Sequence, residues 1–261
     1  MTAQRRRARS RPRGARSGAL VLALMVVTAA VSAEGDGRPQ SPPPEARALL
    51  TEAETLLDAG SYAEARPLIA RVLEIKPDWL RPRGCLGVIH QAEGNREAAL
   101  AEYKALQAGV IVGPADQVDV VAGLAAEVVW LTNGERLARG LRPLKPHPML
   151  SLIANHHSEE MRDLRYFAHE SPLAGHLTPA ERFRDVFGFL PRQVAENIAR
   201  RYSTGGYSLT LDNVRLSHRD LMASDGHRVN ILGPDFTDLG VGLTGNSKGD
   251  LWITELFVRF T

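Results

Sequence analysis

The sequence predicts an α+β protein in which an all-α helical segment precedes a domain of mixed helices and strands. Apolar residues recur at helical spacing between residues 45 and 108, and no strand signal lies among them. After residue 116, helical stripes alternate with short runs in which apolar residues occupy every second position, a pattern typical of strands. Helices that flank a few short strands indicate a layered α+β architecture.

The net charge of +2 comes from the start of the chain. Seven of the 32 Lys and Arg lie before residue 34, where no acidic residue occurs. The rest of the 261-residue chain carries 25 basic and 30 acidic side chains. Such a balance does not favour a basic binding surface, so we expect no nucleic-acid partner. Cys85 is the only cysteine, which excludes an internal disulfide.

Residues 1–33 have the three parts of a secretory signal peptide. An Arg-rich start is followed by an apolar run over residues 18–32, and Val31-Ser32-Ala33 has the small-x-small form of a cleavage site. A membrane-spanning helix needs about 20 apolar residues, so cleavage is favoured over an uncleaved N-terminal anchor. We expect an exported protein, secreted or periplasmic. Residues 34–44 hold four Pro and two Gly, which predicts an extended Pro-rich linker.

Residues 45–112 repeat a helical pattern with a period of 34. Gly60 and Gly94 are separated by this distance, and each follows one helical stripe and precedes another. The predicted helices span residues 45–58, 62–75, 80–92 and 96–108. The segment resembles two tetratricopeptide repeats, because Leu86-Gly87 and Tyr103 fall where the signature of that repeat expects them. A plain stack of two helical hairpins is the alternative. Two repeats rarely bury enough surface alone, so we expect them to pack on the next helix.

The second part of the chain predicts four more helices and three strands. The helices are expected over residues 116–139, 149–164, 178–187 and 209–223, and the strands over 193–200, 239–244 and 252–260. The helix from residue 178 opens with Thr178-Pro179-Ala180-Glu181, a capping signature. His157 lies on the apolar stripe of its helix, which favours a core histidine bonded to backbone. We interpret His218 as a surface residue.

Four motifs, in order, carry a family resemblance. They are Leu131–Arg136 with Gly140–Leu144, Tyr166–His169, Ala195–Ile198 and Ser224–Leu232. Together they resemble the bacterial branch of the CAP superfamily, also called the SCP domain, which includes cysteine-rich secretory proteins, insect antigen 5 and plant pathogenesis-related protein 1. The resemblance covers residues 118–260. It implies a CAP-type α-β-α sandwich, which we place at residues 116–261.

The resemblance also implies a site. The family's central cleft holds two His and two Glu, and some members bind a divalent metal through the His pair. His169, Glu196 and His227 match three of these positions, whereas Ser224 stands where the second Glu is expected. We therefore expect His169 and His227 as metal ligands, with Glu196 and Ser224 beside them in the cleft.

The chemistry of these residues allows two roles. Two neutral imidazoles and a carboxylate can bind a zinc-like ion and leave a coordination position open. Without metal, Glu196 should raise the pKa of both histidines. Glu196 is the only candidate catalytic group at the site. The structural alternative is that Glu196 caps a loop while His169 and His227, the latter expected in a tight loop, bond to backbone carbonyls.

Three functions remain open from the sequence. In the first, the protein is a binding module, with a cleft for a small apolar ligand or lipid, as the resemblance implies, or for a divalent metal. The helical repeats would then bind a protein partner. In the second, it is a metal-dependent cell-envelope hydrolase that uses His169, Glu196 and His227. In the third, it is a structural adaptor whose CAP domain has lost its chemistry.

Overall fold

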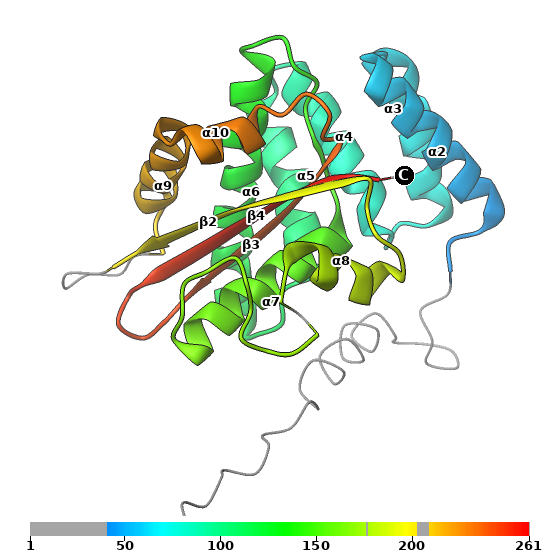
Figure 1. Cartoon of the computed structure of the whole chain (residues 1–261). Helices are drawn as coiled ribbons and strands as arrows, with labels where there is room; N and C mark the ends of the chain where they lie inside the picture. The colour runs from blue at the N-terminus through cyan, green and yellow to red at the C-terminus, as the bar shows by residue number, and fades with distance from the viewer. Residues whose placement is uncertain (1–40, 176, 203–208, 261) are drawn as a thin grey trace, which may run out of the picture. The chain divides into compact units, whose positions relative to one another are not determined.

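The computed structural model describes residues 41–175, 177–202 and 209–260 (Figure 1). The expected signal peptide and most of the expected linker lie outside these residues. Within them, no helix is long and apolar enough to cross a membrane.

The elements form a helical segment followed by a mixed α+β domain, as predicted. The helices are α2 (Pro44–Ala59), α3 (Tyr62–Ile75), α4 (Leu80–Ala92), α5 (Arg96–Ala108), α6 (Ala115–Leu137), α7 (Pro148–Leu164), α8 (Pro179–Phe187), α9 (Leu211–Ala223) and α10 (Asp225–Ile231). The strands are β1 (Lys145–Pro146), β2 (Gln193–Arg201), β3 (Asp238–Gly245) and β4 (Leu251–Arg259). Each predicted helix and strand is present, and only the short α10 and β1 were not predicted.

Helix α10 corrects one expectation, because it places His227 in a helix and not in a tight loop. Ser224-Asp225-Gly226 is a turn signal, but the same residue types also begin helices. Here the Ser224 carbonyl accepts the Arg228 N–H at 2.8 Å, and Asp225 lies in the positively polarised first turn.

The sheet has the order β1-β3-β4-β2. Strand β4 is antiparallel to both neighbours, and β1 is parallel to β3. Because side chains alternate along a strand, β4 contributes to two cores: Ile253 and Phe257 pack with residues of α6, α9 and α10, whereas Leu256 and Val258 pack with residues of α7 and α8. Helices on both faces of one sheet give the expected α-β-α layers (Figure 1).

Helix α7, which carries His157, lies very close to β3, and this contact fixes the position of the helix. A Cβ atom on Gly240 would come within 2.3 Å of the Leu150 backbone, so glycine is required there. The same close approach lets α7 side chains accept hydrogen bonds from β3. The Val241 N–H donates to Ser151 Oγ at 3.2 Å.

The helical segment has its own apolar core, and α5 also packs on α6 as expected. Tyr103 of α5 belongs to the same buried cluster as Leu124 of α6 and Phe257 of β4. The helical segment is therefore packed into residues 42–261 as one unit and not attached only by its chain connection.

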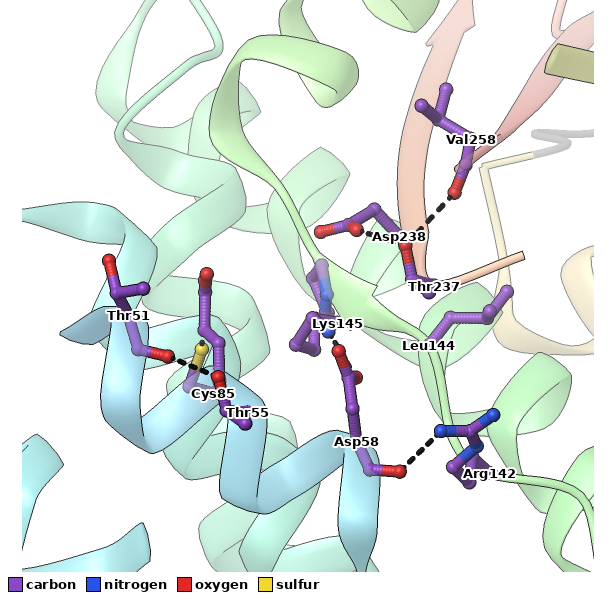
Figure 2. Close-up of polar contacts among 12 residues, drawn as sticks. Thr51, Thr55, Asp58, Cys85, Arg142, Leu144, Lys145, Thr237, Asp238 and Val258 are labelled. Carbon is purple, nitrogen blue, oxygen red and sulfur yellow. Dashed lines mark hydrogen bonds and ion pairs between the residues drawn. The ribbon is translucent and has the colours of Figure 1, made fainter. Parts of the chain in front are cut away.

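Ion pairs join the helical segment to the sheet, and the pair of Arg81 with Asp238 is buried. Arg81 of α4 contacts Glu54 Oε1 and Asp238 Oδ1, each at 2.6 Å. Lys145 pairs with Asp58 of α2, whose backbone carbonyl accepts from Arg142 (Figure 2). We call Arg81, Glu54, Asp238, Lys145 and Asp58 the junction cluster. Burial alone would raise the pKa of Asp238, but the nearby cations bring it below its ordinary value.

Candidate functional site

His169 lies in the loop that follows α7. That helix ends at Arg165, a non-glycine residue in the left-handed conformation with φ of 59°, which turns the chain sharply. The His169 side chain is 48 % exposed, and its Nδ1–H donates to Glu196 Oε1 at 3.0 Å. The bond to a carboxylate orients the ring and fixes the tautomer that leaves the Nε2 lone pair available.

Glu196 is buried and has partners on both carboxylate oxygens. Its side chain is 2 % exposed. Oε2 accepts from Arg182 Nη2 at 2.6 Å, and Oε1 lies 3.0 Å from His169 Nδ1 and 3.6 Å from His157 Nε2. A buried carboxylate held by an arginine and a histidine has little freedom to take a proton from a substrate.

Arg182 is held in place by α8. The predicted capping box is present: Thr178 Oγ1 accepts the Glu181 N–H at 3.2 Å, and Glu181 Oε2 accepts the Thr178 N–H at 2.9 Å. This cap fixes the first turn of the helix. Arg182, one residue later, also donates to the His169 carbonyl at 3.1 Å. It therefore orients both the carboxylate and the loop that carries His169.

His227 and Ser224 lie together on α10, with His227 Nδ1 2.9 Å from Ser224 Oγ. Burial lowers the pKa of His227, and the neighbouring His169 lowers it further. The two imidazoles are thus within electrostatic reach of each other. The expected rise in the pKa of His227 near Glu196 is wrong, because burial and the second histidine act in the opposite direction.

Strand β2 connects the two sides of the site. Glu196 faces the α7 and α8 side, and the next residue, Asn197, faces α10. Asn197 Nδ2 donates to the His227 carbonyl at 3.2 Å and to Glu255 Oε2 at 3.1 Å. Adjacent residues of one strand thereby position both histidines, since successive side chains point to opposite faces.

Glu255 is a buried carboxylate without a cationic partner in the described parts of the chain. It lies on β4, and its Oε1 accepts from Thr132 Oγ1 at 2.9 Å. Burial raises the pKa of Glu255 to about 7, although the hydrogen bonds from Asn197 and Thr132 oppose this rise. Ionisation of Glu255 near neutral pH would be transmitted to His227 by the hydrogen bonds that Asn197 donates to both residues.

Two other histidines test the sequence interpretation. His157 is confirmed as a core residue, since it is buried and its Nε2–H donates to the Ala168 carbonyl at 3.1 Å. Its closeness to Glu196 was not predicted. His218 is not a surface residue: it is buried against α6, and neither ring nitrogen has a hydrogen-bond partner in the described residues.

Arg182 and Glu255 are the site residues that sequence reasoning missed. Glu255 had a visible signal, because it is the one acidic residue in the apolar run Leu251–Val258. Such an interruption points to a buried group with dedicated partners. Arg182 had no such signal, since a charged residue in the first turn of a capped helix is usually exposed.

The site offers few donor atoms for a metal ion. Across residues 41–175, 177–202 and 209–260, no group of three or more His, Cys, Asp or Glu is placed to hold a metal ion. The two imidazoles nevertheless have a common arrangement: each Nδ1 contacts a side-chain oxygen, and neither Nε2 has a partner among these residues. A histidine whose second nitrogen is held by a carboxylate is a frequent metal ligand. The chemistry therefore fits two histidine donors and no third.

The part of the chain that holds this site is similar to known proteins. Residues 129–258 match the model of the cysteine-rich secretory protein family, CAP. The chain is 36 % identical over 138 residues to the uncharacterized protein YkwD of Bacillus subtilis, covering 53 % of this chain and 48 % of that protein. It is 32 % identical over 118 residues to the uncharacterized membrane protein YlbC of the same organism, covering 45 % and 30 %. The chain thus spans about half the length of these relatives, or less.

A solved structure gives a further match. It is an extracellular protein containing an SCP domain from Bacillus anthracis, at 28 % sequence identity and a TM-score of 0.46. The match covers 57 % of this chain and 44 % of that one.

Proposed function

Because residues 129–258 match the CAP family model, we propose that this protein is an exported binding module and not a hydrolase. The observation that carries the proposal is the state of Glu196, whose two oxygens are engaged by Arg182 and His169. A metal-dependent hydrolase built on His169, Glu196 and His227 would need this carboxylate as a base or a ligand. Its ion pair with a buried arginine opposes both uses.

The ligand we propose for the histidine pair is a divalent metal such as zinc. His169 and His227 would bind it through Nε2, while Glu196 and Ser224 hold the opposite ring nitrogens. A metal held by two protein donors keeps open positions, and it would supply a Lewis-acidic point for an oxygen or nitrogen atom of a further ligand. The lowered pKa of His227 keeps this ring neutral, as ligation requires.

Zinc titration calorimetry of the untagged protein tests this proposal. The wild type should bind one equivalent, and His169→Ala and His227→Ala should each abolish binding. His90→Ala, on α4 in the helical segment, is the matched control and should bind like the wild type. Affinity should fall as the pH drops below about 6.5, where imidazoles take up protons. Unchanged zinc binding in either site variant would contradict the proposal.

A small apolar ligand is a second candidate, favoured by exposed side chains beside the site. Phe167, Leu173 and Leu177 are exposed large hydrophobic residues in the same loop as His169. Exposed apolar side chains on the loop that carries His169 favour binding of an amphipathic molecule. A fluorescent fatty-acid probe should bind the wild type and bind more weakly to Phe167→Ser. Leu164→Ser is the control and should bind the probe like the wild type. Binding by Phe167→Ser that equals that of the wild type would exclude the apolar ligand.

For the helical segment we propose two tetratricopeptide-like repeats that bind a protein partner. Gly60 and Gly94 support the repeat, since both are left-handed, with φ of 80° and 78°, at equivalent ends of helices α2 and α4. Gly87 adds to this, because a Cβ there would lie 2.4 Å from the Tyr103 ring. In-cell cross-linking with mass spectrometry should place partner cross-links on α2–α5. Cross-links found only on residues 129–258 would contradict the proposal.

A further inference from the structure

A cavity of about 690 Å³ lies where the helical segment meets the sheet. One wall comes from α2, with Leu50, Thr51 and Thr55, and the other from β1 and from the ends of β3 and β4. Figure 2 shows the junction, with Asp58 of α2 beside Lys145 and with Thr51 and Thr55 on the same helix. The volume lies within the range of small-molecule sites, about 300–1,000 Å³. The cavity requires both parts of the chain, so a CAP domain without these helices would lack it.

Each acidic group of the cavity already has a cationic partner. These groups are Glu54, Asp58 and Asp238, all members of the junction cluster. Arg81 pairs with Glu54 and Asp238, and Lys145 pairs with Asp58. These carboxylates are therefore not free to bind a cationic ligand.

Three arginines from three elements also line the cavity. Arg47 lies in the first turn of α2, Arg192 directly precedes β2, and Arg259 ends β4. Arg192 and Arg259 come from adjacent strand ends, because Gln193 pairs with Arg259 in the sheet. In the described ranges, Arg47 and Arg192 form no ion pair. Arg259 has only an exposed pair with Asp235 at 3.0 Å, a type of contact that contributes little.

We propose that this cavity binds a small anion bearing carboxylate or phosphate groups. Guanidinium groups present paired N–H donors that match both kinds of oxyanion, and two of the three have no competing carboxylate. Trp79 and Phe260 line the same cavity and offer an apolar surface for the carbon skeleton of the ligand. The inference does not depend on the histidine site, with which the cavity shares no residue.

Calorimetric titration of the full chain with citrate and with pyrophosphate tests the proposal, with ionic strength held constant by NaCl. The wild type should bind at least one probe saturably, at one site per chain. The double variant Arg47→Gln/Arg192→Gln should bind the probe about tenfold more weakly or worse, because each lost hydrogen bond to a charged group lowers the affinity several-fold. Arg219→Gln is the matched control, because Arg219 is exposed on α9 and also forms no ion pair among described residues. It should bind like the wild type.

The comparison of the two probes assigns the ligand class. Tighter binding of citrate indicates a carboxylate ligand, and tighter binding of pyrophosphate indicates a phosphate. Far-UV circular dichroism should show the double variant folded, since both arginines are exposed. No saturable binding of either probe, equal binding by the double variant, or an equal loss in Arg219→Gln would overturn the proposal. His169→Ala should retain anion binding, which separates this inference from the proposed metal site.

Discussion

The junction cluster and the histidine site are built from the same chemical unit but are completed differently. Each contains a buried carboxylate with an arginine at 2.6 Å, Asp238 with Arg81 in one and Glu196 with Arg182 in the other. At the junction the surrounding groups are further charged side chains, Glu54, Lys145 and Asp58, which form ion pairs of their own. At the histidine site the next group is His169, which is half exposed and whose Nε2 has no partner in the described part of the chain. One ion pair therefore ties two parts of the chain, and the other supports an accessible imidazole.

This difference shows how a buried ion pair can serve stability or a binding site. Removing one member of either pair leaves an uncompensated buried charge, which destabilises a fold strongly. Removing an accessible group that the pair supports should cost much less. The three predictions below test this contrast, from the largest expected effect to the smallest.

The largest effect is expected for Arg81→Ala. The substitution leaves Glu54 and Asp238 without their shared cation, so the free energy of unfolding should fall by about 3–5 kcal/mol. Urea denaturation measures the loss. Arg83→Ala is the control: Arg83 lies on the same helix and pairs with Glu102 at 3.1 Å, but both side chains are partly exposed. Its loss should not exceed about 1 kcal/mol. Equal losses would mean that the junction cluster does not tie the segment to the sheet.

A smaller, pH-dependent effect is expected for Glu255, the buried carboxylate that has no cationic partner among the described residues. Its pKa is raised from 4.5 to about 7, so its contribution to stability is complete below pH 4.5 and is lost as the pH rises through 7. This loss should reach up to about 3 kcal/mol. Glu255→Gln cannot ionise, so it should lack this part of the pH dependence.

The measurement for Glu255 is urea denaturation at several values between pH 4.5 and pH 8. The difference in stability between Glu255→Gln and the wild type should shift in favour of the variant as the pH rises. Glu181→Gln serves as a comparison, since hydrogen bonds from Thr178 lower the pKa of Glu181, so its contribution is lost only below pH 4.5 and its difference from the wild type should stay constant in this range. A pH-independent difference for Glu255→Gln would show that the carboxylate ionises normally.

The smallest effect is expected for His169→Ala. Half of the side chain is exposed and one hydrogen bond is lost, so the free energy of unfolding should fall by about 1 kcal/mol or less. Thermal denaturation and zinc calorimetry on the same sample would separate stability from binding. A loss as large as that of Arg81→Ala would show that His169 is a structural tie like the junction cluster, and would remove the contrast between the two regions.

Much of the fold could be predicted because its signals are local. The Thr178 capping box, the glycines at 60 and 94 and the alternation of Leu239, Val241 and Leu243 each depend on a few neighbouring residues. Strand β1 has two residues, too few for a pattern, and it exists only because β3 lies beside it. Helix α10 begins with residues that also signal a turn.

The site was only partly predictable, because its second half depends on tertiary packing. Motif resemblance selected His169, Glu196 and His227, and the structure brings Glu196 against His169. The resemblance could not select Arg182, whose burial follows from the position of α8 over Glu196. His218 was misassigned for the same reason, since a histidine on an amphipathic helix gives no sign of which neighbour covers it.

The placement of Glu196 and Asn197 makes the site sensitive to strand register. Strand β2 is at the edge of the described sheet and pairs with β4, with Glu196 opposite Leu256. A slip of one residue that moved Glu196 to the position opposite Glu255 would bring Ala195 to the position opposite Leu256, so that Arg182 faced no carboxylate. Two acids would then meet in the core while a guanidinium lost its counter-charge. The charges of the site therefore make this misaligned register of the sheet unfavourable.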